Sequence, residues 1–305
     1  MARLPHLETE AFHAFIADNQ ACGIHRAGYN GVASLVPKST GNNIFVPTYA
    51  GLNYETISLP GLASYKEKTG YRFEPRAEAM HIESASENRV VLVQPETSHA
   101  HVSARIAFTA EEPHYLHQQI ELTFHRRFCS EDEPNAFRSL WASYLHQPPD
   151  RHLYLKPDWS SGSDATGWFG ITREDHGSPE TLAHPMPDDR ELDVAGHLEA
   201  APPGPSRSAE VFAGLSEALK GPLGFYYGLS HHQAFLMMFA QPDRVRLAYS
   251  PCGGGKQPAW NPAWDYLLHL DDAELDRPYT WDLCLVVRPF GGRTDILDEV
   301  RRYLG

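Results

Sequence analysis

The stretch "SHAHVSARIAFTAEEPHYLHQQIELTFH", residues 98–125, contains two runs in which apolar and polar residues alternate. Alternation with a period of two places successive side chains on opposite faces of a β-strand, so each run predicts a strand with one buried face. The short link "AEEPHY" (110–115) favours an antiparallel hairpin between them. The residues expected to face the core are Val102, Ala104, Ile106, Phe108, Gln118, Ile120, Leu122 and Phe124.

The pairing register of this hairpin follows from its two faces. Both apolar faces must point the same way, which requires odd-numbered positions to oppose odd-numbered positions. One such register places Arg105 opposite Glu121 and His101 opposite His125. Opposite charges across a strand pair are stabilising, so this is the register that we predict.

The polar face of the hairpin is rich in histidine, since five of the 17 histidines of the chain lie in this stretch. Imidazole and carboxylate groups bind zinc, manganese or iron, and imidazole also transfers protons near neutral pH. We therefore predict catalytic or metal-binding roles for His99, His101, Glu121 and His125, and a substrate contact for Arg105. The alternative is a solvated face whose histidines have no chemical role.

Further runs with a period of two occur along the whole chain, separated by Gly, Pro, Asn and Asp. They lie at 88–95, 234–240, 243–250 and 281–290. Helical patterns are few: one at 208–221, one in "RTDILDEVRRYLG" at the C-terminal end, and a short helix expected in "ETEAFHAFIADNQ" near the N-terminal end. Many strands with few short helices predict a mainly β protein, an antiparallel sandwich or barrel.

The chain is expected to form a single domain over residues 1–305, because strand-rich sequence continues on both sides of its one irregular interval. That interval, at about 176–208, is rich in proline and acidic residues and has no strand periodicity. We interpret it as a surface excursion or, alternatively, as a loop at the rim of a site.

Composition limits the partners and the compartment. With 39 acidic and 26 basic residues the formal net charge is −13, which disfavours nucleic acid and anionic membranes as partners. The four cysteines are scattered without a CxxC pair, and neither a signal peptide nor a membrane-spanning run is recognisable. A cytoplasmic protein with reduced cysteines is therefore expected, and the sequence leaves its oligomeric state open, with a homo-oligomer among the allowed states.

Other segments supply candidate ligand contacts. In "FYYGLSHHQ" (225–233), Tyr227 and His231 are secondary candidates for acid–base catalysis. Asn53 lies in a segment rich in Gly, Asn and Tyr, and "SPCGGGKQPAWNPAWDY" (250–266) offers Lys256, Trp260 and Trp264. Tryptophan rings stack on the apolar faces of sugars, so these four residues are candidate substrate contacts, although glycine turns and a packed tryptophan corner explain the same segments.

A resemblance covers most of the chain. The segments "GYNGVASL", "NNIFVPTYAGLNYE", "VVLVQPETSH", "EEPHYLHQQIELTF", "LWASYLHQPPD", "YSPCGGG" and "NPAWDY" resemble a group of bacterial proteins associated with the galactose-mutarotase-like supersandwich. The resemblance implies a large antiparallel β-supersandwich with a sugar site on a concave sheet face. Mutarotases, epimerase-like proteins, glycoside hydrolase domains and polysaccharide lyases use this architecture. The His acid and Glu base of the mutarotases are not assigned to positions of this sequence.

Three functions remain open. The first is a carbohydrate-active enzyme that uses His, Glu and Tyr for acid–base chemistry, as a lyase, an epimerase or a glycoside-cleaving enzyme, with or without a divalent metal (Zn, Mn or Fe). The second is a non-catalytic carbohydrate-binding protein. The third is a cupin-like metal-dependent oxidoreductase that uses His99, His101, Glu121 and His125 as ligands.

Overall fold

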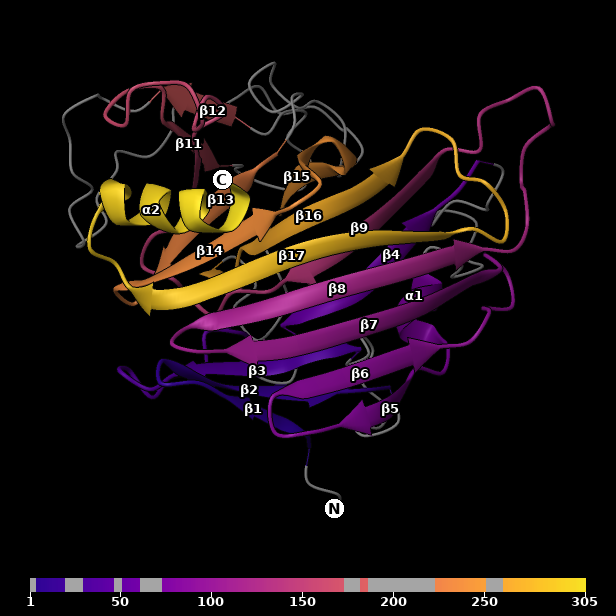
Figure 1. Ribbon diagram of the computed structural model, residues 1–305, viewed down its shortest axis with the longest axis horizontal. Coiled ribbons are helices and arrows are strands. Elements are labelled where there is room, and N and C mark those ends of the chain that lie inside the picture. Colours follow the sequence, from indigo (N-terminus) through magenta and orange to yellow (C-terminus); the bar gives the residue numbers. More distant parts are fainter. Residues whose placement is uncertain are drawn as a thin grey trace.

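Two antiparallel sheets stack face to face in the computed structural model, which describes residues 4–19, 30–46, 51–60, 73–172, 182–185, 223–250 and 260–305 (Figure 1). The seven-stranded sheet has the order β1 (His6–Glu8), β2 (Phe12–Ala17), β3 (Gly31–Pro37), β4 (Leu52–Ser58), β9 (Phe137–Ser143), β16 (Ala263–Leu270) and β15 (Val245–Ser250). We call it the small sheet.

The ten-stranded sheet, called the large sheet, lies in front of it in Figure 1. Its order is β12 (Leu182–Pro185), β11 (Phe169–Thr172), β10 (Leu153–Leu155), β13 (Phe225–Ser230), β14 (Gln233–Phe239), β17 (Pro278–Pro289), β8 (Tyr115–Phe124), β7 (Val102–Glu111), β6 (Arg89–Gln94) and β5 (His81–Ala85). The described helices are α1 (Glu74–Ala77), α2 (Arg293–Leu304) and the 3-10 turn η4 (Pro242–Arg244). The expected mainly β sandwich with few short helices is confirmed.

The core is a layer of apolar side chains that the two sheets share. Trp141 and Trp264 enter it from the small sheet, and Ile106, Ile120 and Trp281 enter it from the large sheet, all without exposed surface. Strand alternation explains this layer, because every second residue of a strand points to the same side. The polar positions of the same strands therefore lie on the outer faces of the sandwich.

The predicted hairpin and its register are confirmed. Strands β7 and β8 pair antiparallel with Arg105 opposite Glu121, and the backbone N–H of His125 donates to the carbonyl oxygen of His101 at 2.8 Å. The strands expected at 88–95, 234–240, 243–250 and 281–290 correspond to β6, β14, β15 and β17.

The short helix expected near the N-terminal end is wrong. The segment forms strands β1 and β2, and Phe12, Ala14 and Ile16 of β2 are fully buried. The reason is the alternation within "FHAFIA", whose apolar side reaches the shared core only in an extended conformation. The C-terminal helix is confirmed as α2, whereas the helix expected at 208–221 lies outside the described residues. Of the 176–208 interval, only β12 is described.

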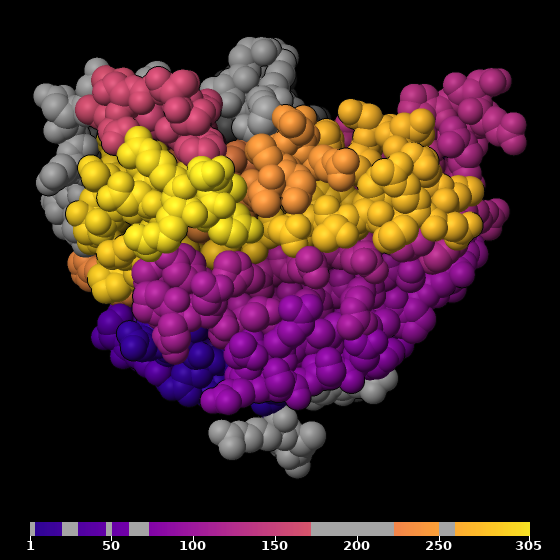
Figure 2. Space-filling view, viewed as in Figure 1, coloured from indigo at the N-terminus to yellow at the C-terminus, as the bar shows by residue number. Residues whose placement is uncertain are grey.

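Helix α2 covers one end of the outer face of the large sheet (Figure 2). Its apolar residues Ile296, Leu297 and Val300 are buried there. At their centre lies Glu299, whose side chain is 1% exposed. The Glu299 carboxylate accepts hydrogen bonds from four side chains: His114 at 3.0 Å, Tyr115 at 2.7 Å, Arg288 at 2.8 Å and Arg302 at 3.0 Å.

Burial alone raises the pKa of Glu299, but the hydrogen bonds from His114, Tyr115 and Arg288 outweigh it and lower the pKa to about 2. The ionised carboxylate therefore joins α2 to β8 and β17, because its donors come from the start of β8, from the end of β17 and from the helix itself.

We expect Glu299→Gln to lower the free energy of unfolding by about 3 kcal/mol, because it removes the charge of a carboxylate that is 1% exposed and that binds Arg288 and Arg302. Chemical denaturation followed by circular dichroism measures this loss. The matched control is Asp298→Asn on the same helix, whose side chain is 60% exposed. Its expected effect is about 0.5 kcal/mol or less, and an equal loss in both variants would contradict a specific role of Glu299.

The pH dependence of this contribution has a defined sign. The pKa of Glu299 in the fold lies near 2, below its ordinary value of 4.5. Its stabilisation is therefore complete above pH 4.5 and is lost as the pH falls from there through about 2. The difference in unfolding free energy between the wild type and Glu299→Gln should be constant near neutral pH and shrink in acid. A difference that is independent of pH throughout would refute this account.

Candidate active site

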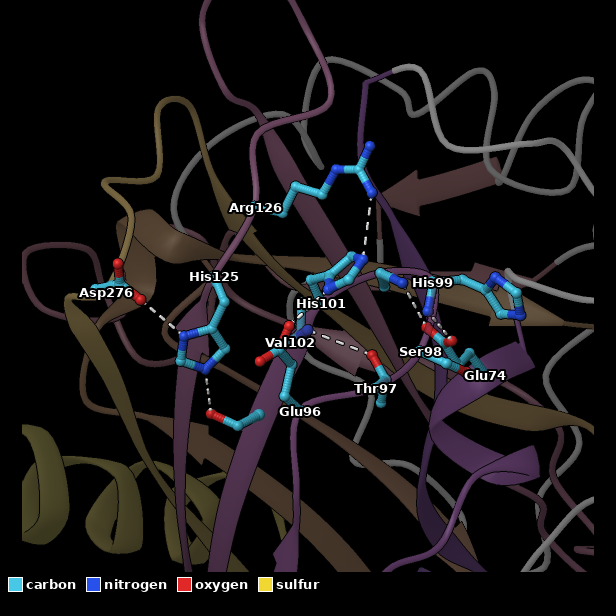
Figure 3. Close-up of polar contacts among 12 residues, drawn as sticks. Glu74, Glu96, Thr97, Ser98, His99, His101, Val102, His125, Arg126 and Asp276 are labelled. Carbon is cyan, nitrogen blue, oxygen red and sulfur yellow. Dashed lines mark hydrogen bonds and ion pairs between the residues drawn. The ribbon is translucent and has the colours of Figure 1, made fainter.

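The predicted histidines lie at the end of the large sheet where β7 begins and β8 ends (Figure 3). Figure 3 shows their rings spread along this end, and the rings of His101 and His125 have different partners. The ring of His101 contacts Glu96 at 2.6 Å, and that of His125 contacts Asp276 at 2.8 Å and Ser103 at 2.9 Å. His99 is exposed, and its backbone N–H donates to Glu74 at 2.7 Å. The imidazoles of this face therefore do not converge on one point.

The four predicted metal ligands are not gathered in this structure. Among the described residues, two groups of three potential ligands have their ligand atoms within 4.8 Å of one another: Glu74 with Glu78 and His99, and His6 with Glu8 and His13. Glu121 is four residues from His125 on the same strand, which is about 13 Å in an extended chain. The register aligns His101 with His125 but leaves Glu121 too distant to share an ion with them.

Arg105 lies on the same outer face, where it forms an ion pair with Glu83 of β5 at 2.5 Å instead of contacting Glu121. A hollow of about 260 Å³ on this face lies towards the other end of the strands. It is lined by Arg89, Ala107, Thr109, Glu111, His117, Gln118, Gln119, Asp282, Leu283 and Tyr303. None of the predicted site residues lines this hollow, so their catalytic and binding roles remain predictions.

The two secondary candidates lie in different surroundings. Tyr227 of β13 has no exposed surface and belongs to the apolar cluster under α2, so no substrate reaches it in this structure. His231 occupies the turn between β13 and β14, with a φ of 49°. Burial lowers the pKa of His231, and the nearby His146 and His232 lower it further. Tyr227 and His231 therefore do not form the expected pair.

The residues predicted to contact the substrate also lie in different surroundings. Trp264 is fully buried in the core, where its ring packs over Gly228 so closely that a Cβ there would lie 2.4 Å from it. It has no face left for a sugar ring, which corrects that prediction. Trp260 is 63% exposed and Asn53 is buried on the small sheet, whereas Lys256 lies outside the described residues.

Asn53 lies beside a group of buried polar residues on the outer face of the small sheet, which we call the acid cluster: Glu55, Arg76, Tyr144 and Asp265. Glu55 occupies a β-bulge of β4, where the pairing with β9 shifts between Tyr54 and Thr56. The bulge adds one residue, so Tyr54 and Ile57 both stay in the core while the Glu55 carboxylate is free to point outward.

Two donors hold the Glu55 carboxylate. Arg76 of α1 and the hydroxyl of Tyr144, just after β9, each contact its Oε1 atom at 2.6 Å. The side chains of Arg76 and Glu55 are 10% and 7% exposed, so this charge pair is shielded from water. Charge-assisted hydrogen bonds of this kind are short and fix the orientation of the carboxylate.

Asp265 of β16 is the second carboxyl of the acid cluster and is 4% exposed. Continuing the strand registers places Ala142 between Asp265 and Asn53, and the backbone N–H of Ser143 donates to Asp265 at 2.8 Å. Burial raises the pKa of Asp265 well above its ordinary value, and the negative charge of Glu55 raises it further, although the Ser143 hydrogen bond lowers it. Asp265 therefore favours its protonated form.

This arrangement places a carboxylate held by two donors on the same sheet face as a carboxyl whose pKa is raised. Two carboxyls in unequal surroundings on one face are an arrangement that can supply a base and an acid at the same pH. A sequence signal was present, because each acid interrupts a strand of otherwise apolar or neutral residues, in "LNYETIS" and "AWDYLLHL". An acid rarely occupies a buried position without a partner or a function.

Comparison with known proteins identifies the architecture. A crystal structure of a protein assigned as an aldose 1-epimerase from Escherichia coli K12 is similar over 94% of this chain and 99% of that chain, with a TM-score of 0.54 and 12% sequence identity. This chain has the galactose-mutarotase-like fold. A GalM/aldose epimerase homologue from C. elegans matches over 94% of this chain and 99% of that chain, with a TM-score of 0.45 and 10% identity.

Sequence comparison adds nothing to this assignment. No protein-family model matches the chain, and no curated protein matches it in sequence. The similarity to solved structures at these identities concerns the fold alone. Within the described residues, no helix has the length and apolar character needed to cross a bilayer.

The acid cluster generates a stability prediction. Asp265→Asn keeps an acceptor for the Ser143 N–H but removes a group whose pKa in the fold is raised above its ordinary value of 3.8. The wild type therefore loses stability as the pH rises above 3.8 towards the pKa of the folded state. We expect the variant to be more stable than the wild type at neutral pH, by an amount that grows with pH.

Thermal unfolding at a series of pH values measures this difference. The matched control is Asp271→Asn, at the end of the same strand, where the side chain is fully exposed. It should leave the stability profile unchanged. An Asp265→Asn variant that is less stable than the wild type at neutral pH would indicate that the carboxyl serves the fold instead.

Proposed function

We propose that this protein is a carbohydrate-active enzyme that performs acid–base chemistry with Glu55 as the base and Asp265 as the acid. The observation that carries the proposal is the pair of buried carboxyls on one sheet face, one held by Arg76 and Tyr144 and the other with a raised pKa. A structure without a chemical need for them would replace such acids by apolar residues at a gain in stability.

The reaction that fits this pair best is ring opening of an aldose at its anomeric carbon. Glu55 accepts the proton of the anomeric hydroxyl while Asp265 donates its proton to the ring oxygen. The bond between the anomeric carbon and the ring oxygen breaks, which gives an open-chain aldehyde and a free hydroxyl. Rotation of the aldehyde followed by the reverse proton transfers yields the other anomer. The proton count balances, and each carboxyl recovers its starting state after the return step.

Neighbouring residues have supporting roles in this proposal. Arg76 and Tyr144 orient the Glu55 carboxylate. Burial excludes water that would otherwise compete with the sugar hydroxyl for contact with this carboxylate. Asn53 lies on the same face, with the small side chain of Ala142 between it and Asp265. The fold similarity to the E. coli protein is consistent with a sugar substrate and supplies no residue assignment.

The test is an anomer-exchange assay on a panel of aldoses, with polarimetry or NMR and correction for the spontaneous reaction. We expect the wild type to accelerate exchange, and Glu55→Gln and Asp265→Asn each to lower kcat by about 100-fold or more, with a smaller effect on KM, because each variant removes one proton-transfer group. Asp271→Asn is the control and should retain wild-type turnover.

Three outcomes would contradict the proposal. Full turnover in Glu55→Gln and Asp265→Asn would exclude the acid cluster as the catalytic site. A loss of turnover in Glu121→Gln with normal turnover in Asp265→Asn would return the chemistry to the histidine face. Saturable binding of aldoses without exchange, and without formation of unsaturated products from uronic-acid polysaccharides, would instead support a non-catalytic carbohydrate-binding protein.

A further inference from the structure

Three potential metal ligands lie on one face of the β1–β2 hairpin, at the edge of the small sheet. Glu8 of β1 is directly opposite His13 of β2, and His6 is two residues before Glu8 on the same strand. Positions two apart share a face, and directly opposed positions share a face across the pair. Leu7 and Ala14, which alternate with these residues, are fully buried in the core. The backbone register alone therefore brings two imidazoles and one carboxylate together.

The ligand atoms form a compact triangle. His6 Nε2 lies 2.9 Å from His13 Nδ1, and Glu8 Oε2 lies 3.7 Å from His13 Nδ1 and 4.0 Å from His6 Nε2. Zinc binds nitrogen and oxygen at about 2.0–2.2 Å, so two ligands of one tetrahedral ion are about 3.3 Å apart. The three observed separations, from 2.9 to 4.0 Å, lie on both sides of that value and within about 0.7 Å of it. Small side-chain rotations suffice to place an ion between them.

The surroundings favour binding. The ring of His6 stacks on Phe15 with centroids 4.8 Å apart, which orients its nitrogen. Lys38 contacts the other carboxylate oxygen, Glu8 Oε1, at 2.5 Å, so it competes with an ion for the charge of Glu8 but leaves Oε2 available as a ligand. The side chains of His6, His13 and Glu8 are 24%, 34% and 49% exposed, so an ion can enter from solvent and retain water in its remaining positions. A formal net charge of −13 also attracts cations.

We propose that His6, Glu8 and His13 bind one zinc ion, which cross-links the two N-terminal strands. Two imidazoles and one carboxylate are a known ligand set for zinc. Binding replaces the hydrogen bond between His6 and His13 with coordinate bonds from both rings, and no group is oxidised or transferred. Strand β1 has only three residues and a single neighbour, β2, so the ion supplies a connection that its short ladder lacks. This site is independent of the acid cluster.

The test uses the full-length protein after treatment with a chelator, titrated with zinc sulfate by calorimetry. We expect a single site per chain, with at least about tenfold weaker binding in His6→Gln and in His13→Gln. Zinc should raise the melting temperature of the wild type but not of these variants. Cobalt(II) provides a second measurement, because its visible absorption reports nitrogen and oxygen coordination and should disappear in both variants.

Two controls define specificity. His117→Gln removes another partly exposed histidine, which lies 3.0 Å from Glu111, and should bind zinc like the wild type. Lys38→Met removes the cation that competes for Glu8 and should bind zinc more tightly. Circular dichroism establishes that each variant is folded, so that a loss of binding is not a loss of structure.

The proposal is overturned if the wild type shows no saturable zinc binding. It is equally overturned if zinc binding persists in His6→Gln and His13→Gln but is lost in His99→Gln, since the ion would then occupy the group formed by Glu74, Glu78 and His99. Weaker binding in Lys38→Met would contradict the role given to Glu8.

Discussion

One apolar layer, shared by both sheets, constrains everything else in this molecule. Each strand that contributes to it must give every second side chain to the interior, as β7 gives Ile106 and β16 gives Trp264. The fit is tight, since Gly228 of the large sheet lies directly under the Trp264 ring. Most charged groups of these strands therefore lie on the two outer faces and at the ends of the strands, where chemistry is possible.

The buried carboxyl groups on the two outer faces have pKa shifts in opposite directions. On the large sheet, Glu299 is surrounded by donors that lower its pKa, so its charge contributes to the stability of the fold. On the small sheet, Asp265 is deprived of water beside the charge of Glu55, which raises its pKa at a cost in stability. A buried carboxylate that accepts hydrogen bonds from several donors is typical of a structural ion network. A buried acid that is kept at a cost in stability is typical of a reactive site.

The sequence predicted the strands and the β7–β8 register because both depend on a period of two, which is a local property. The sequence-based prediction of a short helix near the N-terminal end was wrong at β2. The six residues of β2 alternate with a period of two, whereas the apolar residues around them have a helical spacing. The sequence-based prediction also assembled the histidines wrongly, because alternation fixes the face of His101 and His125 but not the partners of their rings. Glu55 and Asp265 were visible as acids in strands, yet only the fold shows that both are buried on the same sheet face.

The bulge at Glu55 has a consequence for how this fold diversifies. Because β4 carries one residue more than its partner β9 at this point, removing that residue would leave Tyr54 and Ile57 in the core and delete the carboxylate without disturbing the sandwich. The position of this carboxylate thus depends on one inserted residue, whereas the core on either side of it does not.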